Sequence, residues 1–296
     1  MDIKSKTSGI LYVVPTPIGN LSDLSEHIIN TLSIVDIIAA EDTRRAMYLL
    51  NHLGIHKKLV SYHKFNELTK ADYLIHKLLS GKSVAIVTDA GTPCISDPGY
   101  ILVRNATKNH IQVIGLCGPC AAITALSVSG FNTNSFAFWG FLPRKKCEIQ
   151  STLKNAMAAN TNVGVFYESP KRILETINII CSKYPEIELC LCNDLTKKYE
   201  MIYRGTAIDV LAQLTNNSYS EKGEYTLVLN FASLNKSDGV VANFKNHHLE
   251  SVLLDYLIDN DCSIKDAVNQ LSKMQPYRRN ELYKASLRMK LLLEKK

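Results

Sequence analysis

The chain contains 296 residues with a formal net charge of +6 at pH 7, and 46% of the residues are hydrophobic while 21% are charged. This balance is typical of an ordinary soluble globular protein. No apolar run approaches the roughly 18 residues that a membrane-spanning helix needs. Residues 1–8 also lack the apolar core of a signal peptide, so we expect a cytoplasmic protein. The length predicts two domains and leaves room for a small third.

The eight cysteines are scattered along the chain, and several lie inside apolar runs, namely Cys181, Cys190 and Cys192. In a chain that is long enough to form its own core and lacks a signal peptide, such cysteines are expected to be buried, reduced thiols. The mild positive charge is compatible with a polyanionic partner.

Short apolar runs alternate with helical spacing along the first half of the chain. Strands are predicted at 9–14, 35–40, 58–62, 83–87 and 111–115. The helix after the first strand is predicted to begin near Ser22 and Asp23, which are good N-cap residues, and the helix after the second strand is predicted to stop near Gly54. The third helix runs to about Leu79, and the fourth covers residues 100–106. The fifth helix has Pro119 in its first turn. Strand and helix alternate five times, which predicts a parallel sheet with crossover helices.

A second group of strands is predicted at 136–141, 162–167, 187–192, 200–205 and 224–229, and the last two are expected to pair. Helices are expected after residues 144–146, after residues 168–172 and near 208–214. We therefore predict an N-terminal α/β domain at 1–118, a second α/β domain at 119–232, a polar linker at 233–247 and a small helical domain at 248–296 with helices at 249–258, 264–274 and 278–293.

Residues 88–99 form the most distinctive loop of the chain, because they contain two glycines and two prolines between a predicted strand and a predicted helix. Such strand-to-helix loops are where open α/β sheets bind ligands. The side chains of Asp89, Thr92, Ser96 and Asp97 add polar groups. An ordinary polar turn is the alternative, but the length and stiffness of the loop favour a binding rim for a small polar ligand.

Cys117-Gly118-Pro119-Cys120 lies between a predicted strand and a predicted helix, which is the setting of a thioredoxin-like redox motif. Four strand–helix steps precede it, whereas a thioredoxin domain carries the motif near its start. We therefore favour a turn that lets the helix terminus approach a ligand. A thiol–disulfide oxidoreductase that uses Cys117 and Cys120 remains the alternative.

Several other site classes lack their motifs. Residues 15–20 contain neither the G-x-G-x-x-G spacing of dinucleotide-binding proteins nor a P-loop ending, which argues against NAD, FAD and ATP. His63 and His76 have no metal-ligand spacing with cysteines or carboxylates, and no Gly-x-Ser-x-Gly elbow is present. We therefore expect no metal.

The C-terminal helices carry an excess of positive charge. From Pro276 onward the chain has seven Lys or Arg, among them Arg278 and Arg279, against Glu281 and Glu294. A solvated helix face and a basic module that contacts nucleic-acid phosphates are both compatible with this pattern.

Motifs spread nearly end to end resemble the tetrapyrrole methylase superfamily, the class III S-adenosylmethionine-dependent methyltransferases. The matching segments are residues 16–21, 40–44, 61–63, 66–67, 89–93, 95–99, 140–143, 168–172 and 195–197, with a tail that resembles a small helical C-terminal domain at 263–267 and 280–283. In particular, the chain resembles the members that methylate the ribose 2′-hydroxyl of a decoding-centre cytidine, number 1402, in 16S ribosomal RNA. A methylase of a small tetrapyrrole precursor is the alternative, but it gives the basic tail and Glu41-Asp42-Thr43-Arg44 no purpose.

The chain departs from that resemblance at two places. The family usually has Pro-Gly-Pro-Ser-Ala where this chain has Cys-Gly-Pro-Cys-Ala at 117–121, which replaces a hydroxyl by a thiol in a cofactor-facing loop. It usually has a second histidine where this chain has Phe65, which bears on any catalytic role of that position.

The resemblance implies two α/β domains with S-adenosylmethionine folded in the cleft between them, a small C-terminal helical domain, and a homodimer that acts on 16S rRNA or the 30S subunit. By the resemblance, one wall of the cofactor site would consist of Thr16, Pro17, Ile18 and Gly19, and its floor would consist of Asp89, Gly91, Thr92, Pro93 and Ser96. The helix terminus would bound the site with Cys120 and Ala121. The second domain would close over the adenine with Tyr167, Leu195 and Thr196.

The implied reaction needs in-line placement of the hydroxyl and a proton acceptor, because a ribose hydroxyl is a poor acid. The candidate acceptors are Glu41, His63 and Glu168; Asp42 shares their loop position but is equally suited to cap the following helix. The implied phosphate track is Arg44, Arg45, Arg144, Lys145, Lys171, Arg172 and Lys197, extended by Arg278 and Arg279. The sequence does not choose among the acceptors.

Overall fold

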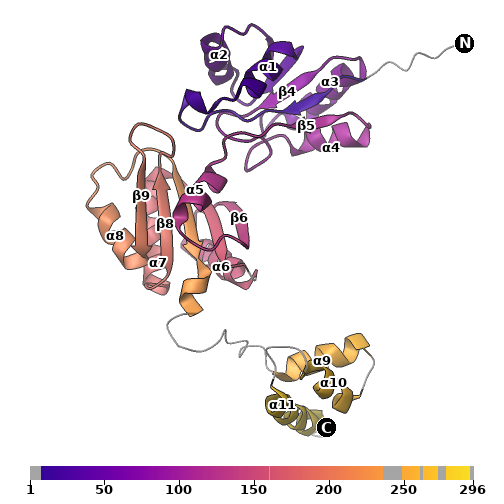
Figure 1. Ribbon diagram of the computed structural model, residues 1–296, viewed down its shortest axis with the longest axis vertical. Helices are drawn as coiled ribbons and strands as arrows, with labels where there is room; N and C mark the ends of the chain where they lie inside the picture. The colour runs from indigo at the N-terminus through magenta and orange to yellow at the C-terminus, as the bar shows by residue number, and fades with distance from the viewer. Residues whose placement is uncertain (1–7, 160, 236–248, 261–262, 273–277, 294–296) are drawn as a thin grey trace, which may run out of the picture. The chain divides into compact units, whose positions relative to one another are not determined.

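The computed structural model describes residues 8–159, 161–235, 249–260, 263–272 and 278–293 (Figure 1). The chain forms two compact units, of which the first ends at Leu234 and the second begins at Asn235. The first unit contains two five-stranded sheets, and the second is helical. No helix of the described residues is long and apolar enough to cross a membrane.

The first sheet has the strand order β3-β2-β4-β1-β5, and its neighbouring strands are all parallel, as predicted. Its strands are β1 (Leu11–Val13), β2 (Ile37–Ala40), β3 (Lys58–Ser61), β4 (Val84–Val87) and β5 (Val113–Gly115). Because every strand runs the same way, all five loops that follow the strands emerge at one edge of the sheet.

Helices cover both faces of this sheet (Figure 1). They are α1 (Glu26–Ile34), α2 (Thr43–His52), α3 (Glu67–Leu79) and α4 (Tyr100–Lys108). Alternate residues of a strand point to opposite faces. Ile37 and Ala39 therefore pack with α3 and α4, while Ile38 and Ala40 pack with α1 and α2. Both faces are buried, which explains why the strands read as continuous apolar runs.

Two predicted helix starts are wrong. Ser25, not Ser22, caps α1, because its hydroxyl accepts a hydrogen bond from the Ile28 amide at 3.2 Å. Residues Leu21–Asp23 instead form a separate 3-10 turn, η1. Pro119 also lies outside α5 (Ala121–Ser129), whose N-cap is Cys120.

The second sheet has the order β6-β7-β10-β8-β9 and is mixed, since β6 and β7 are parallel and the other neighbours are antiparallel. Its strands are β6 (Phe136–Phe141), β7 (Val163–Glu168), β8 (Glu188–Asn193), β9 (Met201–Thr206) and β10 (Tyr225–Asn230). The expectation that the last two strands pair is wrong. β9 pairs with β8, its neighbour in the chain, and β10 inserts between β7 and β8.

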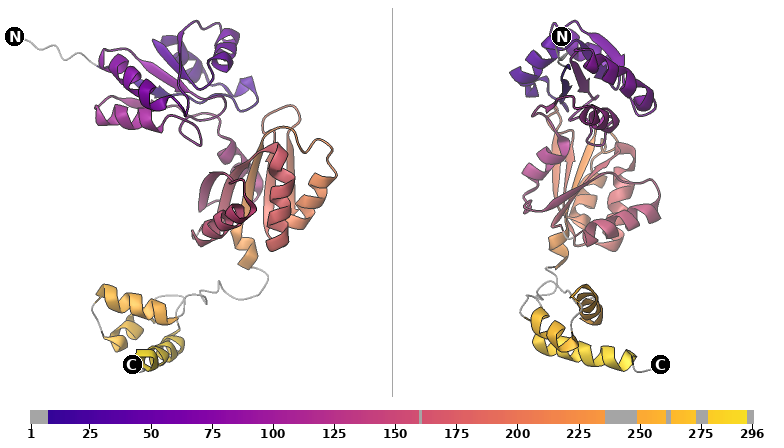
Figure 2. Two further views of the ribbon diagram at one scale, coloured as in Figure 1. Left: turned by 180° about the vertical axis from the view of Figure 1, so that it is seen from behind. Right: turned by 90° about the vertical axis from the view of Figure 1, so that its right-hand side faces the viewer.

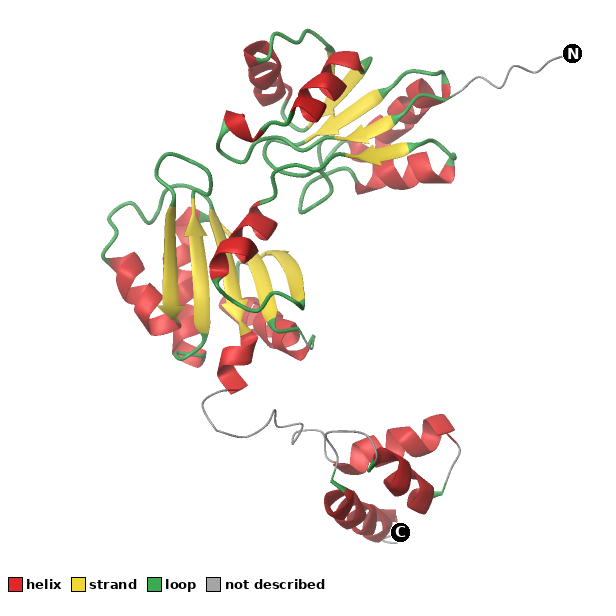
Figure 3. Cartoon of the chain, in the orientation of Figure 1, coloured by secondary structure: helices red, strands yellow, loops and turns green. Residues whose placement is uncertain are grey.

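Helix α5 packs on one face of the second sheet, against residues such as Val165 and Val228. The opposite face carries α6 (Lys146–Ala158), α7 (Pro170–Lys183) and α8 (Ala207–Thr215), which contact Phe166 and Leu227 (Figures 2 and 3). Side chains along β7 alternate between the two faces of the sheet, so each face has its own apolar cluster, as in the first sheet.

The second unit contains the three predicted helices, α9 (Leu249–Asn260), α10 (Ile264–Leu271) and α11 (Arg279–Leu293). Leu253, Leu271 and Leu282 are buried in its small core. The predicted linker at 233–247 begins inside a second 3-10 helix, η2 (Phe231–Asn235), and residues 236–247 lie outside the described residues. The predicted boundaries between domains remain predictions.

The cysteine prediction is partly wrong. The seven cysteines within the described residues are free, and Cys190 and Cys192 are buried as expected, whereas Cys181 is only half-buried. Cys117 and Cys147, however, are exposed, because they lie in the loop before α5 and on the outer side of α6.

Candidate active site

Two neighbouring cavities open where the strands of the first sheet end. The first, of about 400 Å³, is bordered by the 88–99 loop on one side and by the adjoining ends of β7 and β10 on the other. The second, of about 490 Å³, lies between residues 16–21 and α2. Arg45 and Asp89 line both cavities. The carboxyl edge of a parallel sheet is the expected position for such sites.

The 88–99 loop is held in an uncommon backbone conformation. Gly91 has φ +88°, and Cys94 and Ser96 have φ +71° and +67°, which non-glycine residues rarely adopt. Thr16 and Gly91 exchange two backbone hydrogen bonds of 2.9 and 3.0 Å, which tie this loop to the loop after β1. Backbone conformations of this kind persist where the surroundings fix them, and they concentrate at functional sites.

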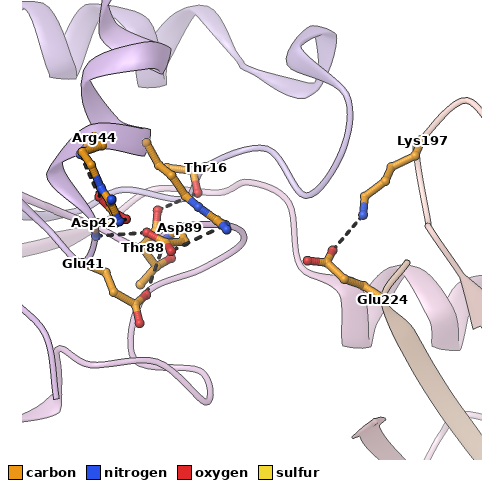
Figure 4. Close-up of polar contacts among 9 residues, drawn as sticks. Thr16, Glu41, Asp42, Arg44, Thr88, Asp89, Lys197 and Glu224 are labelled. Carbon is orange, nitrogen blue, oxygen red and sulfur yellow. Dashed lines mark hydrogen bonds and ion pairs between the residues drawn. The ribbon is translucent and has the colours of Figure 1, made fainter. Parts of the chain in front are cut away.

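The loop after β1 meets a loop of the second sheet at Gly19. A Cβ atom there would lie 2.4 Å from the Lys197 side chain and 3.0 Å from the Leu195 carbonyl oxygen, so this approach requires glycine. Lys197 in turn donates to Asp194 at 2.6 Å. It also donates to Glu224 at 3.0 Å (Figure 4). Loops from both sheets therefore contact each other beside the cavities.

Five acidic residues line the 400 Å³ cavity, and three of them come from loops of the first sheet: Glu41 after β2, and Asp89 and Asp97 in the 88–99 loop. Asp89 accepts a hydrogen bond from the Asp42 amide at 3.0 Å, and its own amide donates to Glu41 at 3.5 Å (Figure 4). Asp89 also forms an ion pair with Arg45 at 3.5 Å.

Crowding and burial alter the acidity of this cluster. Partial burial raises the pKa of Glu41, and the neighbouring Asp89 adds to the effect. Burial likewise raises the pKa of Asp97 to about 7, with contributions from Glu41 and Asp89. Two carboxyl groups at the cavity can thus exchange protons closer to neutral pH than an ordinary carboxyl group.

Glu168 is occupied by structural contacts. Its side chain is fully buried, forms an ion pair with Arg172, and accepts from the Ser169 amide at 2.6 Å and the Thr176 hydroxyl at 2.8 Å. Arg172 also donates to the carbonyl oxygens of Leu142 and Pro143, both at 3.0 Å. These contacts fix the start of α7 against the end of β6, and they leave Arg172 with few donors for a phosphate.

The other two candidate proton acceptors, Asp42 and His63, make local contacts at the starts of helices. Asp42 caps α2 by accepting from the Arg44 amide at 2.9 Å, as its alternative role predicted. His63 lies before α3, where its Nδ1 accepts from the Phe65 amide at 3.3 Å. Among the residues that line the two cavities, Glu41 is present and His63 is not.

Most predicted cofactor residues meet at these two cavities. Those that line the 400 Å³ cavity are Ile18, Asp89, Gly91, Thr92, Ser96, Cys120, Ala121 and Tyr167. Thr16 and Pro17 line the other cavity. Gly19, Pro93, Leu195 and Thr196 line neither, although Leu195 and Thr196 contact the Gly19 position.

Tyr167 is fixed beside the 400 Å³ cavity by aromatic neighbours. Its ring packs edge-on against Phe138 and Phe141, with centroids 4.9 and 5.5 Å away. Burial raises the pKa of its hydroxyl, so this group stays protonated at neutral pH.

The basic residues predicted to contact phosphates differ in how exposed they are and in whether they already form ion pairs. The Arg44 and Arg45 side chains are 89% and 66% exposed beside the second cavity, although Arg44 pairs with Asp42 at 2.6 Å. Arg144, Lys145 and Lys171 are exposed at the starts of α6 and α7. Arg172 and Lys197 are held by internal ion pairs instead. Arg278 and Arg279 belong to the helical unit, where Arg279 donates to Asn269 at 3.1 Å.

Asp97 was predicted at the binding rim but was given no role in the cofactor site, and residues 224–226 at the start of β10 were not predicted at the site; all of them line the cavity. Asp97 lies in the 88–99 loop, and its position as the second carboxylate of that loop, beside Asp89, was the available signal. The start of β10 carried none. It reaches the site because β10 runs antiparallel to β7, which places Tyr225 opposite Glu168. Within the described residues, no group of three or more His, Cys, Asp or Glu could hold a metal ion.

Comparison with known proteins agrees with this geometry. A family model described as Tetrapyrrole (Corrin/Porphyrin) Methylases matches residues 10–210. A diphthine synthase structure has a TM-score of 0.59 at 12% identity and covers 77% of this chain and 95% of its own. A uroporphyrin-III-C-methyltransferase from Thermus thermophilus has a TM-score of 0.52 at 18% identity, over 76% of this chain and 96% of its own. The fold is that of the tetrapyrrole methylases, which use S-adenosylmethionine as the methyl donor.

Curated relatives identify the group within this family to which the chain belongs. A protein of Buchnera aphidicola subsp. Schizaphis graminum named ribosomal RNA small subunit methyltransferase I is 40% identical over 98% of this chain and 99% of its own. The protein of that name in Escherichia coli O157:H7 is 38% identical over 95% of this chain and 96% of its own. The chain therefore belongs to the tetrapyrrole methylase family, in the group of ribosomal RNA small subunit methyltransferase I.

Proposed function

We propose that this protein transfers a methyl group from S-adenosylmethionine to the ribose 2′-hydroxyl of the decoding-centre cytidine in 16S ribosomal RNA. The observation that carries the proposal is the carboxylate-rimmed cavity of about 400 Å³ beside exposed arginines, in a chain 38–40% identical to relatives named for small-subunit rRNA methylation. We further propose that it acts in the cytoplasm as a homodimer.

The cavity suits the methyl donor in size and chemistry. Its volume lies in the range of about 300–1,000 Å³ that small-molecule sites occupy. The aromatic side chain of Tyr167 and the apolar Ile18 and Ala121 line it together with the carboxylates. The residues that would hold the donor are Ile18, Asp89, Gly91, Thr92, Ser96, Cys120, Ala121 and Tyr167. When bound, S-adenosylmethionine supplies an activated methyl group on its sulfonium.

The protein's part in the reaction is then to position the ribose and to accept a proton. Glu41 is the acceptor we propose, because it lines the cavity and its raised pKa favours proton uptake. Asp97 is a second group at the same wall, with a pKa of about 7. Glu168 and His63 are not proposed as proton acceptors, because the Glu168 carboxylate is fully engaged in internal hydrogen bonds and His63 does not line either cavity. Arg44 and Arg45 would hold phosphates beside the entrance.

The test is methylation of a defined RNA. Purified protein is incubated with labelled S-adenosylmethionine and either 30S subunits or naked 16S RNA lacking the modification, and the RNA is digested to nucleosides. We expect labelled 2′-O-methylcytidine, and we expect Glu41→Gln to lower kcat at least tenfold, while Glu26→Gln on the exposed side of α1 does not. Label in neither RNA, or label on a base, would contradict the proposal.

A further inference from the structure

The 490 Å³ cavity has no assigned ligand, and we name it the α2 groove: Pro17 and Leu21 on one side, and Arg44, Arg45, Tyr48 and Leu49 of α2 on the other, with Val87 at its floor. It differs in character from the cofactor cavity. One aromatic side chain and several aliphatic ones surround it, with two guanidinium groups at the rim.

The side chains of the groove are available to a ligand. Tyr48 is 73% exposed, although it is a large apolar ring on a helix whose buried face is supplied by Leu50. Leu21 is also exposed, at 37%. The Arg44 and Arg45 side chains are 89% and 66% exposed. An exposed aromatic ring beside guanidinium groups is the combination that proteins use to stack a nucleobase and hold its phosphate.

The groove adjoins the cofactor cavity through a shared wall. Asp89 and Arg45 line both spaces, and they form an ion pair at 3.5 Å. Asp89 also accepts a hydrogen bond from the Asp42 amide at 3.0 Å, and the Arg45 side chain is 66% exposed. An anion in the groove can therefore reach Arg45 from the α2 side.

We propose that the α2 groove binds the nucleotide next to the methylated one, with its base stacked on Tyr48 and its phosphate on Arg44 and Arg45. This inference rests on the proposed function. It adds a base-binding subsite that positions the RNA strand, so that the neighbouring ribose lies over the shared wall at the cofactor cavity. The volume of about 490 Å³ accommodates one nucleotide, and the arginines match its charge.

The test removes the ring and then restores it. Tyr48→Ala is expected to weaken binding to naked 16S RNA and to 30S subunits about tenfold, at the low end of the effect of losing one base stack, because the ring is exposed. Tyr48→Phe keeps the ring and should bind like the wild type. Tyr219→Ala removes a ring of comparable exposure, 65%, that lines neither cavity, and it should have no effect on RNA binding.

Two readouts separate this site from the cofactor site. Calorimetric titration should give the same affinity for S-adenosylmethionine in all three variants, and Tyr48→Ala should raise KM for RNA more than it lowers kcat. Ultraviolet crosslinking of 16S RNA that carries a photoreactive nucleotide placed directly beside the target cytidine should attach that nucleotide to α2. Unchanged RNA affinity in Tyr48→Ala, or a crosslink of that nucleotide to a segment outside the α2 groove, would overturn the proposal while the wild-type enzyme still methylates cytidine. Loss of 2′-O-methylcytidine from the wild-type reaction would instead contradict the proposed function.

Discussion

Replacing Glu168 by glutamine tests whether this carboxylate stabilises the second sheet or takes part in the reaction. Its fully buried side chain binds Ser169, Arg172 and Thr176. Removing one partner of a buried ion pair typically costs about 3–5 kcal/mol. Glutamine keeps one acceptor oxygen, and Arg172 stays 25% exposed with two carbonyl partners. We therefore expect the free energy of unfolding to fall by about 3 kcal/mol.

The chain provides its own reporter for this measurement. Trp139 is the single tryptophan, and it stacks on Phe166 of β7 with ring centroids 6.5 Å apart. Urea unfolding followed by tryptophan fluorescence therefore monitors the sheet that holds Glu168. Glu175→Gln, at an exposed position of the same helix, is the matched control and should unfold like the wild type. If Glu168→Gln is as stable as the wild type but its kcat collapses, the carboxylate is catalytic and the structural interpretation is wrong.

Three further outcomes are expected. Asp97→Asn should raise the melting temperature at pH 8, because ionising a carboxyl whose folded pKa is raised from 3.8 to about 7 destabilises the folded state; the gain should shrink below pH 7 and vanish near pH 4, and a pH-independent gain would refute this cause. Gly19→Ala should weaken binding of S-adenosylmethionine several-fold in a calorimetric titration, since the added Cβ meets Lys197 and the Leu195 carbonyl, whereas Gly115→Ala, which meets nothing within 4 Å and has no positive φ, should not. Cys117→Ser combined with Cys120→Ser should retain most methyl transfer in the labelled-RNA assay; abolished transfer together with disulfide reduction by the wild type would favour the redox alternative.

The first sheet was predictable because each strand carries its own signal. Both of its faces are covered, so residues such as Ile37 to Ala40 form an unbroken apolar run between polar loops. Parallel topology then follows from the alternation with helices, and it places the ends of β2 and β4 side by side. The proximity of Glu41 and Asp89 follows from this local pattern and one topological rule.

The second sheet was only partly predictable, because the neighbours of its strands are not adjacent in the chain. Nothing in residues 225–230 indicates that β10 pairs with β7 and β8 rather than with β9. The cavity residues at the start of β10 were missed for that reason. The role of Glu168 was also hidden. Its spacing of four residues to Arg172 is visible in the sequence, but burial, which turns that pair into a structural contact, comes from the packing of α7.

The central position of β10 has a consequence for how the protein is made. The first sheet is complete once residue 115 has been synthesised, but the second lacks a middle strand until residue 230 emerges. Until then β7 and β8 each present an open backbone edge where β10 will pair. The 400 Å³ cavity is therefore among the last parts of this unit to assemble during translation, and truncation before β10 removes part of its border while leaving every strand of the first sheet in place.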